Sequence, residues 1–144
     1  MQENRGKTPF HLWIIGILAV LWNAMGAFDY TATQMQLDFY MSQFSEAQLQ
    51  YFYAFPAWVD ASWAIAVWGS LLASFLLLLR KALAAWLFGL AILGMVGTST
   101  YSLVLTDGAK MMGDGAMYFT VVIWVIALLL YFYATAMAKR RVLT

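Results

Sequence analysis

Four long apolar stretches constrain this chain more than any other feature of its sequence. They cover residues 10–28, 57–79, 82–105 and 116–137. A helix needs about 20 mostly apolar residues to cross the hydrocarbon core of a bilayer. Because lipid offers backbone amides no partner, such segments cross as helices, and the alternating polarity of a membrane β-barrel is missing here. The sequence therefore predicts an all-α membrane bundle of four transmembrane helices, forming a single domain over residues 1–144.

The composition excludes most soluble classes of protein. Hydrophobic residues make up 64% of the chain and charged residues only 10%, whereas soluble domains carry about 25% charged residues. The chain has no cysteine and one histidine, His11, which excludes a disulfide, a thiol nucleophile and a multi-histidine metal site within one chain. We therefore expect a protein that contacts the lipid bilayer, that holds no metal or cofactor, and that does not bind nucleic acid.

The distribution of charge predicts the orientation of the chain. If the chain crosses four times, seven of its eight basic residues fall on one side and six of its seven acidic residues on the other. The seven basic residues are Arg5, Lys7, Arg80, Lys81, Lys139, Arg140 and Arg141. Positively charged flanks of membrane spans stay in the cytoplasm. The sequence therefore predicts that both termini are cytoplasmic.

Residues 29–56 are the one long segment outside the four stretches, and we expect them to cap the outer mouth of the bundle. Ser45 with Gln48 three residues later fits a capping box, which predicts a short interfacial helix over about residues 46–53. Two aromatic clusters within residues 29–56 are typical of a membrane interface. The alternative is an ordinary ordered loop whose aromatic side chains lie at the interface.

Polar side chains within the apolar stretches gather toward the outer end and predict a ligand pocket there. Such groups are costly in lipid and usually face the interior of a bundle. A carboxylate such as Asp60, just inside an apolar segment, needs water, a hydroxyl donor, a cation or a proton. We therefore expect a water-filled outer vestibule anchored by Asp60 and closed toward the cytoplasm by a leucine-rich inner half. The expected ligand-binding residues are Asp60, Asn23, Asp29, Thr98, Tyr101 and Thr120.

Three of these residues also have simpler interpretations. Asp60 lies near the start of a predicted helix, where a carboxylate complements the helix dipole. Asp29 lies at the membrane edge and fits an exposed interfacial charge. Asn23 fits a hydrogen bond to a neighbouring helix.

Small residues predict which helices pack together. Ala66, Ser70 and Ser74 recur every four residues in the second stretch, and the third stretch contains Gly89 and Gly94. Faces of small residues let helix backbones approach closely. Since only two residues connect the second and third stretches, we expect these helices to be antiparallel neighbours. A contact face for a second copy of the chain is the alternative.

The first half of the chain carries a distinctive set of residues. They are His11-Leu12-Trp13, Leu21-Trp22-Asn23, Gly26, Asp29-Tyr30, Thr33-Gln34, Phe55-Pro56-Ala57-Trp58, Trp63-Ala64 and Ala66-Val67-Trp68-Gly69. With them the chain resembles a group of small four-span bacterial inner-membrane proteins of unknown function, which are often labelled sugar transporters. The resemblance covers most of the chain. It implies location in a bacterial inner (cytoplasmic) membrane and a hypothesis of transport, and it brings no catalytic or binding residues with it.

The sequence therefore predicts an inner-membrane protein that binds a small polar or amphipathic molecule in an outward-facing pocket, for transport or sensing. We expect no enzyme, because the chain offers only scattered carboxylates and no acid or base opposite a nucleophile. The alternative is a non-catalytic accessory subunit that packs against a larger membrane complex. The absence of a clear internal repeat or broken helix, which transporters show, favours that alternative. A homo-oligomer or a larger complex is the expected partner.

The charge pattern makes a direct prediction about topology. Reporter fusions at Thr144 and near Ser42 should report opposite sides of the membrane, with Thr144 in the cytoplasm, because the basic residues flank the spans on one side only. Activity of a periplasmic reporter compared with a cytoplasmic reporter measures the side of each fusion. The same side for both positions would contradict four crossings.

Overall fold

The computed structural model describes residues 6–144, and over that range the chain is built from helices and their connections. Four helices are long and apolar enough to cross a membrane, which confirms the predicted all-α bundle. They are α1 (Phe10–Gln34), α4 (Ala57–Leu78), α5 (Leu83–Thr100) and α7 (Asp114–Lys139). A π-helical turn, η1 (Tyr101–Leu105), extends α5, and the short helices are α2 (Asp38–Met41), α3 (Glu46–Tyr53) and α6 (Gly108–Met112).

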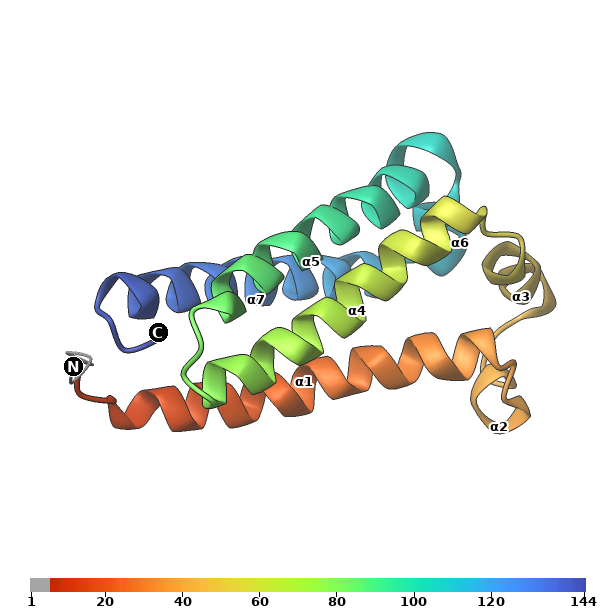
Figure 1. Ribbon diagram of the computed structural model, residues 1–144. Helices are drawn as coiled ribbons and strands as arrows, with labels where there is room; N and C mark the ends of the chain where they lie inside the picture. Colours follow the sequence, from red (N-terminus) through yellow and green to blue (C-terminus); the bar gives the residue numbers. More distant parts are fainter. Residues whose placement is uncertain (1–5) are drawn as a thin grey trace.

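The four long helices pack in a row in the order α1, α4, α5 and α7. α4 lies between α1 and α5, and α5 in turn packs against α7. Both ends of the described chain lie at one end of the bundle, which we call the terminal end, and α2, α3 and α6 lie at the other, the distal end (Figure 1). The ribbons of α1 and α5 diverge toward the distal end, where α3 lies between them.

α4 and α5 are the most closely packed pair, as the small residues predict. A Cβ placed on Gly94 of α5 would lie 2.5 Å from the carbonyl oxygen of Ser62 and 2.9 Å from the nitrogen of Ala66, both on α4. No side chain fits at that distance. Close backbone contact of this kind is what holds membrane helices together where lipid is as apolar as the helices themselves.

α1 is longer than its apolar stretch and ends at Gln34 rather than at residue 28. Hydropathy marks where polar residues begin, and polar residues do not by themselves end a helix. The hydroxyls of Thr31 and Thr33 each donate to the carbonyl four residues earlier, at 2.8 Å, so their polar groups are satisfied within the helix. The helix ends where Gln36 adopts a left-handed φ of 52°. Similarly, α7 extends beyond residues 116–137 at both of its ends.

The buried apolar core lies at the terminal end. Leu12, Leu77, Phe88 and Leu130 belong to it and come from the four long helices. This half of the bundle therefore contains a buried apolar cluster to which all four long helices contribute.

The chain ends close the terminal end further. Arg80, in the short α4–α5 connection, donates from Nε to the carbonyl of Val142 at 3.1 Å and from Nη2 to the carbonyl of Gly6 at 3.2 Å. The backbone N–H of Gly6 donates to the carbonyl of Arg141 at 3.0 Å. Val142 and Leu143 are buried against the core. One cationic side chain therefore joins the α4–α5 connection to both ends of the described chain.

The distal end contains the predicted capped helix. The N–H of Gln48 donates to the Ser45 hydroxyl at 3.2 Å, and the N–H of Ser45 donates to Oε1 of Gln48 at 3.0 Å, so both arms of the capping box are present. α3 begins at Glu46 and ends at Tyr53, as predicted. Nε2 of Gln48 also donates to the carbonyl of Met111 at 3.3 Å, which fixes α3 against α6.

Replacing Ser45 with alanine should destabilise α3. The change removes the hydroxyl that satisfies a free N–H at the helix start, which costs about 0.5–2 kcal/mol. Hydrogen exchange over residues 49–53 measures the loss as faster exchange. Ser42→Ala is the matched control, because its hydroxyl makes one local bond of 3.3 Å to the Phe39 carbonyl outside α3. Equal exchange in the parent and Ser45→Ala would contradict the capping role.

Candidate functional site

A cavity of about 440 Å³ lies among α1, α4, α5 and α7. It extends from α3 at the distal end down to Phe88 and Leu130, which belong to the buried core. Its wall is mostly apolar and aromatic, with a small number of polar side chains. Ligand sites in proteins have this character, and their volumes are about 300–1,000 Å³.

α3 and the segment after it cover the distal end of the cavity. Tyr51, Phe52 and Phe55 line the cavity from this side. The Tyr51 hydroxyl lies 3.0 Å from Oγ1 of Thr106, and Gly108 of α6 packs directly against the same hydroxyl. The expected cap over the mouth of the bundle is therefore a roof that is hydrogen-bonded to the η1–α6 connection.

Four of the six residues expected to bind a ligand line this cavity. They are Asn23 and Asp29 of α1, Thr98 of α5 and Thr120 of α7. Asp60 and Tyr101 do not belong to the lining. The structure thus brings together polar residues from three of the four long helices, and leaves out the residue that was expected to anchor the site.

Asp60 lies between α1 and α4, beside the cavity wall. Its Oδ1 accepts from Nε2 of Gln34 at 2.9 Å, and the carboxylate is partly exposed in the first turn of α4. Asp60 therefore lies beside the cavity rather than in its wall, where it was expected. The physical cause is the length of α1. Because α1 continues to Gln34, an amide donor reaches Asp60 from outside the cavity. The position fits the alternative in which the carboxylate complements the helix dipole.

Tyr101 lies outside the cavity lining, where it packs against other aromatic rings. Its ring centroid lies 5.4 Å from that of Phe55, 5.9 Å from that of Trp58 and 6.1 Å from that of Tyr51. Such edge-on and tilted contacts are favourable between aromatic rings. Tyr101 therefore joins the roof helix to α4 and η1, and a direct contact between Tyr101 and a ligand stays a prediction.

Asn23 lies near the middle of α1, deeper than expected, because α1 extends to Gln34. Its Nδ2 donates to Oγ of Ser74 at 2.9 Å, and Ser74 donates to the carbonyl of Ser70 at 2.8 Å. The alternative interpretation of Asn23 as an interhelical bond is therefore confirmed. Since Asn23 and Ser70 also line the cavity, this α1–α4 network forms part of its wall.

Asp29 provides the one carboxylate of the lining, and no lysine, arginine or histidine lines the cavity within the described part of the chain. Its Oδ1 accepts from the Tyr40 hydroxyl at 2.5 Å. A carboxylate accepts hydrogen bonds at both oxygens, and the contacts of residues 6–144 give Oδ2 no side-chain donor. Asp29 is half-buried against the cavity and is therefore more than a free charge at the membrane edge.

The site prediction did not include Tyr40, although sequence periodicity places it on the same face as Asp29 if α1 continued as a helix. The chain instead turns at Gln36, and α2 brings Tyr40 back to Asp29. The ring of Phe28 packs edge-on against Tyr40 at 5.5 Å. Burial raises the pKa of the Tyr40 hydroxyl above the ordinary 10.0, and the hydrogen bond to Asp29 and the charge of that carboxylate raise the pKa further.

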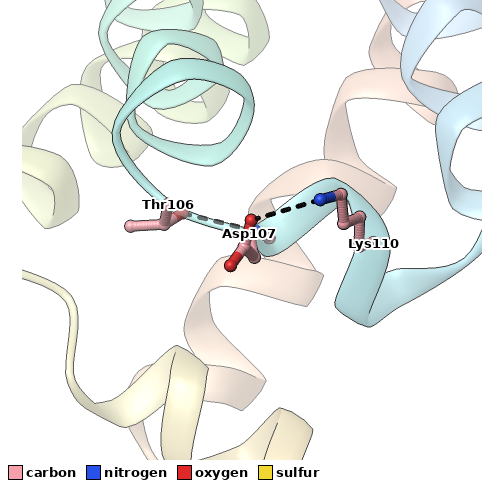
Figure 2. A network of polar contacts seen from close by, with 4 residues as sticks. Thr106, Asp107 and Lys110 are labelled. Atoms are coloured by element: carbon pink, nitrogen blue, oxygen red, sulfur yellow. Dashed lines mark hydrogen bonds and ion pairs between the residues drawn. The ribbon is translucent and has the colours of Figure 1, made fainter.

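An exposed ion pair lies at the start of α6. Asp107 and Lys110 are paired at 3.8 Å on the exposed side of α6, next to Thr106 (Figure 2). An exposed pair of this kind contributes little stability. Across residues 6–144, no group of three histidine, cysteine or acidic residues is placed to hold a metal ion. After α6 the chain turns at Gly113, whose φ is 85°.

Comparison with known proteins adds no assignment to this geometry. No protein-family model matches the chain, and neither the curated proteins nor the solved structures compared with it contain a match. The resemblance to small four-span bacterial proteins therefore stays a prediction, and the site is interpreted from its own contacts.

The contact between Tyr40 and Asp29 predicts a pH dependence. Because the pKa of Tyr40 is raised in the folded protein, the unfolded chain loses this proton at a lower pH than the folded chain. The stability that Tyr40 contributes is therefore complete below the ordinary tyrosine value of 10.0 and is lost as the pH rises above it.

In an alkaline absorbance titration, Tyr40→Phe should remove one tyrosine from the group that ionises last. Tyr53→Phe is the control for the loss of any one tyrosine, because the Tyr53 side chain is exposed beside the same helix cluster. Loss of amplitude from the ordinary step in Tyr40→Phe would contradict the assignment.

Proposed function

We propose that the protein binds a small amphipathic molecule in the cavity between α1, α4, α5 and α7, in the service of transport or sensing. The observation that carries this proposal is the single carboxylate of Asp29 on a largely apolar wall, without a basic side chain among the described lining residues. A ligand that matches this wall has an apolar body and one polar, positively charged or hydrogen-donating group.

The apolar part of the ligand would occupy the deeper region of the cavity. Phe88, Ile123 and Leu130 line it there. Burying apolar surface against these side chains contributes about 25 cal/mol for each Å² removed from water. The dry core below Phe88 would limit how far such a ligand reaches toward the terminal end.

The polar part would lie against Asp29, near the distal end of α1. A carboxylate that accepts one hydrogen bond at Oδ1 has an oxygen left for a donor from the ligand. The rings of Trp22, Trp63 and Phe55 line the same cavity, and aromatic faces attract cationic groups. Charge and rings together favour an ammonium group over an anionic or neutral one.

Two further proposals, on the location of the protein and on the absence of catalysis, follow from the sequence. We infer a bacterial inner membrane as the location, with the terminal end in the cytoplasm and the distal end outside, so that the roofed cavity lies in the outward-facing half. We propose a binding protein rather than an enzyme, because the cavity contains one carboxylate and no second acid, base or nucleophile pairs with it among the described residues, apart from the Tyr40 hydroxyl.

A long-chain primary alkylamine is the probe that tests the proposal. Replacing Asp29 with asparagine should weaken its binding by roughly tenfold or more, because a hydrogen bond to a charged group contributes about 1.5–3 kcal/mol. Tryptophan fluorescence of the full chain in lipid nanodiscs measures the affinity. The corresponding alkyl alcohol should bind the parent and the variant with similar affinity.

Asp60→Asn is the matched control, because it removes a carboxylate that lies outside the cavity. It should leave the affinity for the alkylamine unchanged, and circular dichroism should show both variants folded. Equal binding by Asp29→Asn and the parent would sink the proposal. In that case a stoichiometric protein partner in native mass spectrometry would favour the accessory-subunit alternative.

A further inference from the structure

The cavity is closed at both ends of the bundle but not along all of its sides. α3 and α6 cover it at the distal end, and the core closes it toward the terminal end. Along its sides α1 packs on α4, α4 on α5 and α5 on α7. α1 and α7, both described over their full length, do not pack closely backbone to backbone. The remaining side of the cavity is therefore a seam between these two helices.

Two pairs of side chains make ring contacts or hydrogen bonds across this seam. Toward the distal half the ring of Trp22 lies 5.9 Å from the ring of Phe119. Toward the terminal end Nδ1 of His11 lies 2.6 Å from the Tyr133 hydroxyl. Over the described length of α1 and α7, these two pairs are the ring contacts and side-chain hydrogen bonds that join them. Trp22 and Phe119 both line the cavity, so their contact closes the seam directly in front of it.

The rim of the seam belongs to the apolar outer surface of the bundle. Met25 of α1 is 62% exposed and Phe119 of α7 is 54% exposed, and both also line the cavity. The same side chains thus contact the cavity on one side and the surroundings of the membrane span on the other. The Trp22–Phe119 pair therefore lies between the cavity and the outer apolar surface of the bundle.

The alternative route, through the roof, needs more contacts to break. It would separate Tyr51 from Thr106, at 3.0 Å, and Gln48 from the carbonyl of Met111, at 3.3 Å. It would also unpack the aromatic rings that surround Phe55. By comparison, the ring contact across the seam in front of the cavity is the single tilted Trp22–Phe119 pair.

We propose that the ligand enters sideways from the membrane, between α1 and α7 and past the Trp22–Phe119 pair. The ligand is then a membrane-dissolved amphiphile with one cationic headgroup, rather than a solute taken up from water. An amphiphile in a bilayer already keeps its head at the interface and its chain in the hydrocarbon. Sideways entry brings the head to Asp29 and the chain to the apolar depth without moving either through an unfavourable medium. This inference rests on the proposed function, since it assumes that the cavity is occupied.

The chain offers a clean test because it contains no cysteine. A seam pair, Trp22→Cys with Phe119→Cys, and a roof pair, Gln48→Cys with Met111→Cys, are each bridged by a bifunctional methanethiosulfonate reagent. The full chain is studied in lipid nanodiscs. The probe is a long-chain primary alkylamine carrying a diazirine, and mass spectrometry follows the rate at which its photo-adducts appear on the cavity-facing residues of α7.

Bridging the seam pair should slow the appearance of adducts severalfold, and bridging the roof pair should leave the rate unchanged. Before bridging, adducts should appear faster in the Trp22→Cys/Phe119→Cys variant than in the parent, because both bulky rings are gone. Slowing by the roof bridge, alone or equally with the seam bridge, would overturn sideways entry while the proposed function stands. No cavity adducts in the unbridged parent would overturn the proposed function and this inference with it.

Discussion

The close packing of α4 against α5 is the contact on which the rest of this structure depends. It is possible because Gly94 has no side chain where the two backbones meet. With this pair fixed, α1 packs on the free side of α4, and α7 packs on α5. The row of helices does not close between α1 and α7, so the bundle retains a cavity. The same arrangement explains both the close packing at the centre of the bundle and the seam between α1 and α7.

The two ends of the bundle use different physical means to stay closed. At the terminal end, apolar side chains fill the interior and Arg80 donates hydrogen bonds to backbone carbonyls near both ends of the described chain. At the distal end, aromatic rings and a few hydroxyls hold the roof above polar cavity walls. A core filled by side chains leaves no volume for a ligand, whereas helices that diverge under a roof leave room for one. The cavity therefore extends from the core toward the distal end, where the ribbons of α1 and α5 diverge.

Much of the fold was predictable because it depends on short-range patterns. Apolar stretches locate the four long helices, since each must satisfy its own backbone in lipid. Ser45 and Gln48 define the start of α3 because a capping box involves residues three apart. Small residues at regular spacing indicate the α4–α5 contact, and a two-residue connection requires the two helices to be antiparallel. Each of these features is complete within a few residues or within two adjacent segments.

The polar site was predictable only in part, because it depends on where helices end and which of them meet. The sequence by itself determined the membrane class, the four helices and the gathering of polar groups toward one end. Only the tertiary structure decided that Asp29, and not Asp60, lies against the cavity. The cause is the extension of α1 to Gln34, which pairs Gln34 with Asp60, and the left-handed turn at Gln36, which returns Tyr40 to Asp29. Contacts of this kind join segments whose relative placement is fixed by packing across the bundle, and no local pattern encodes them.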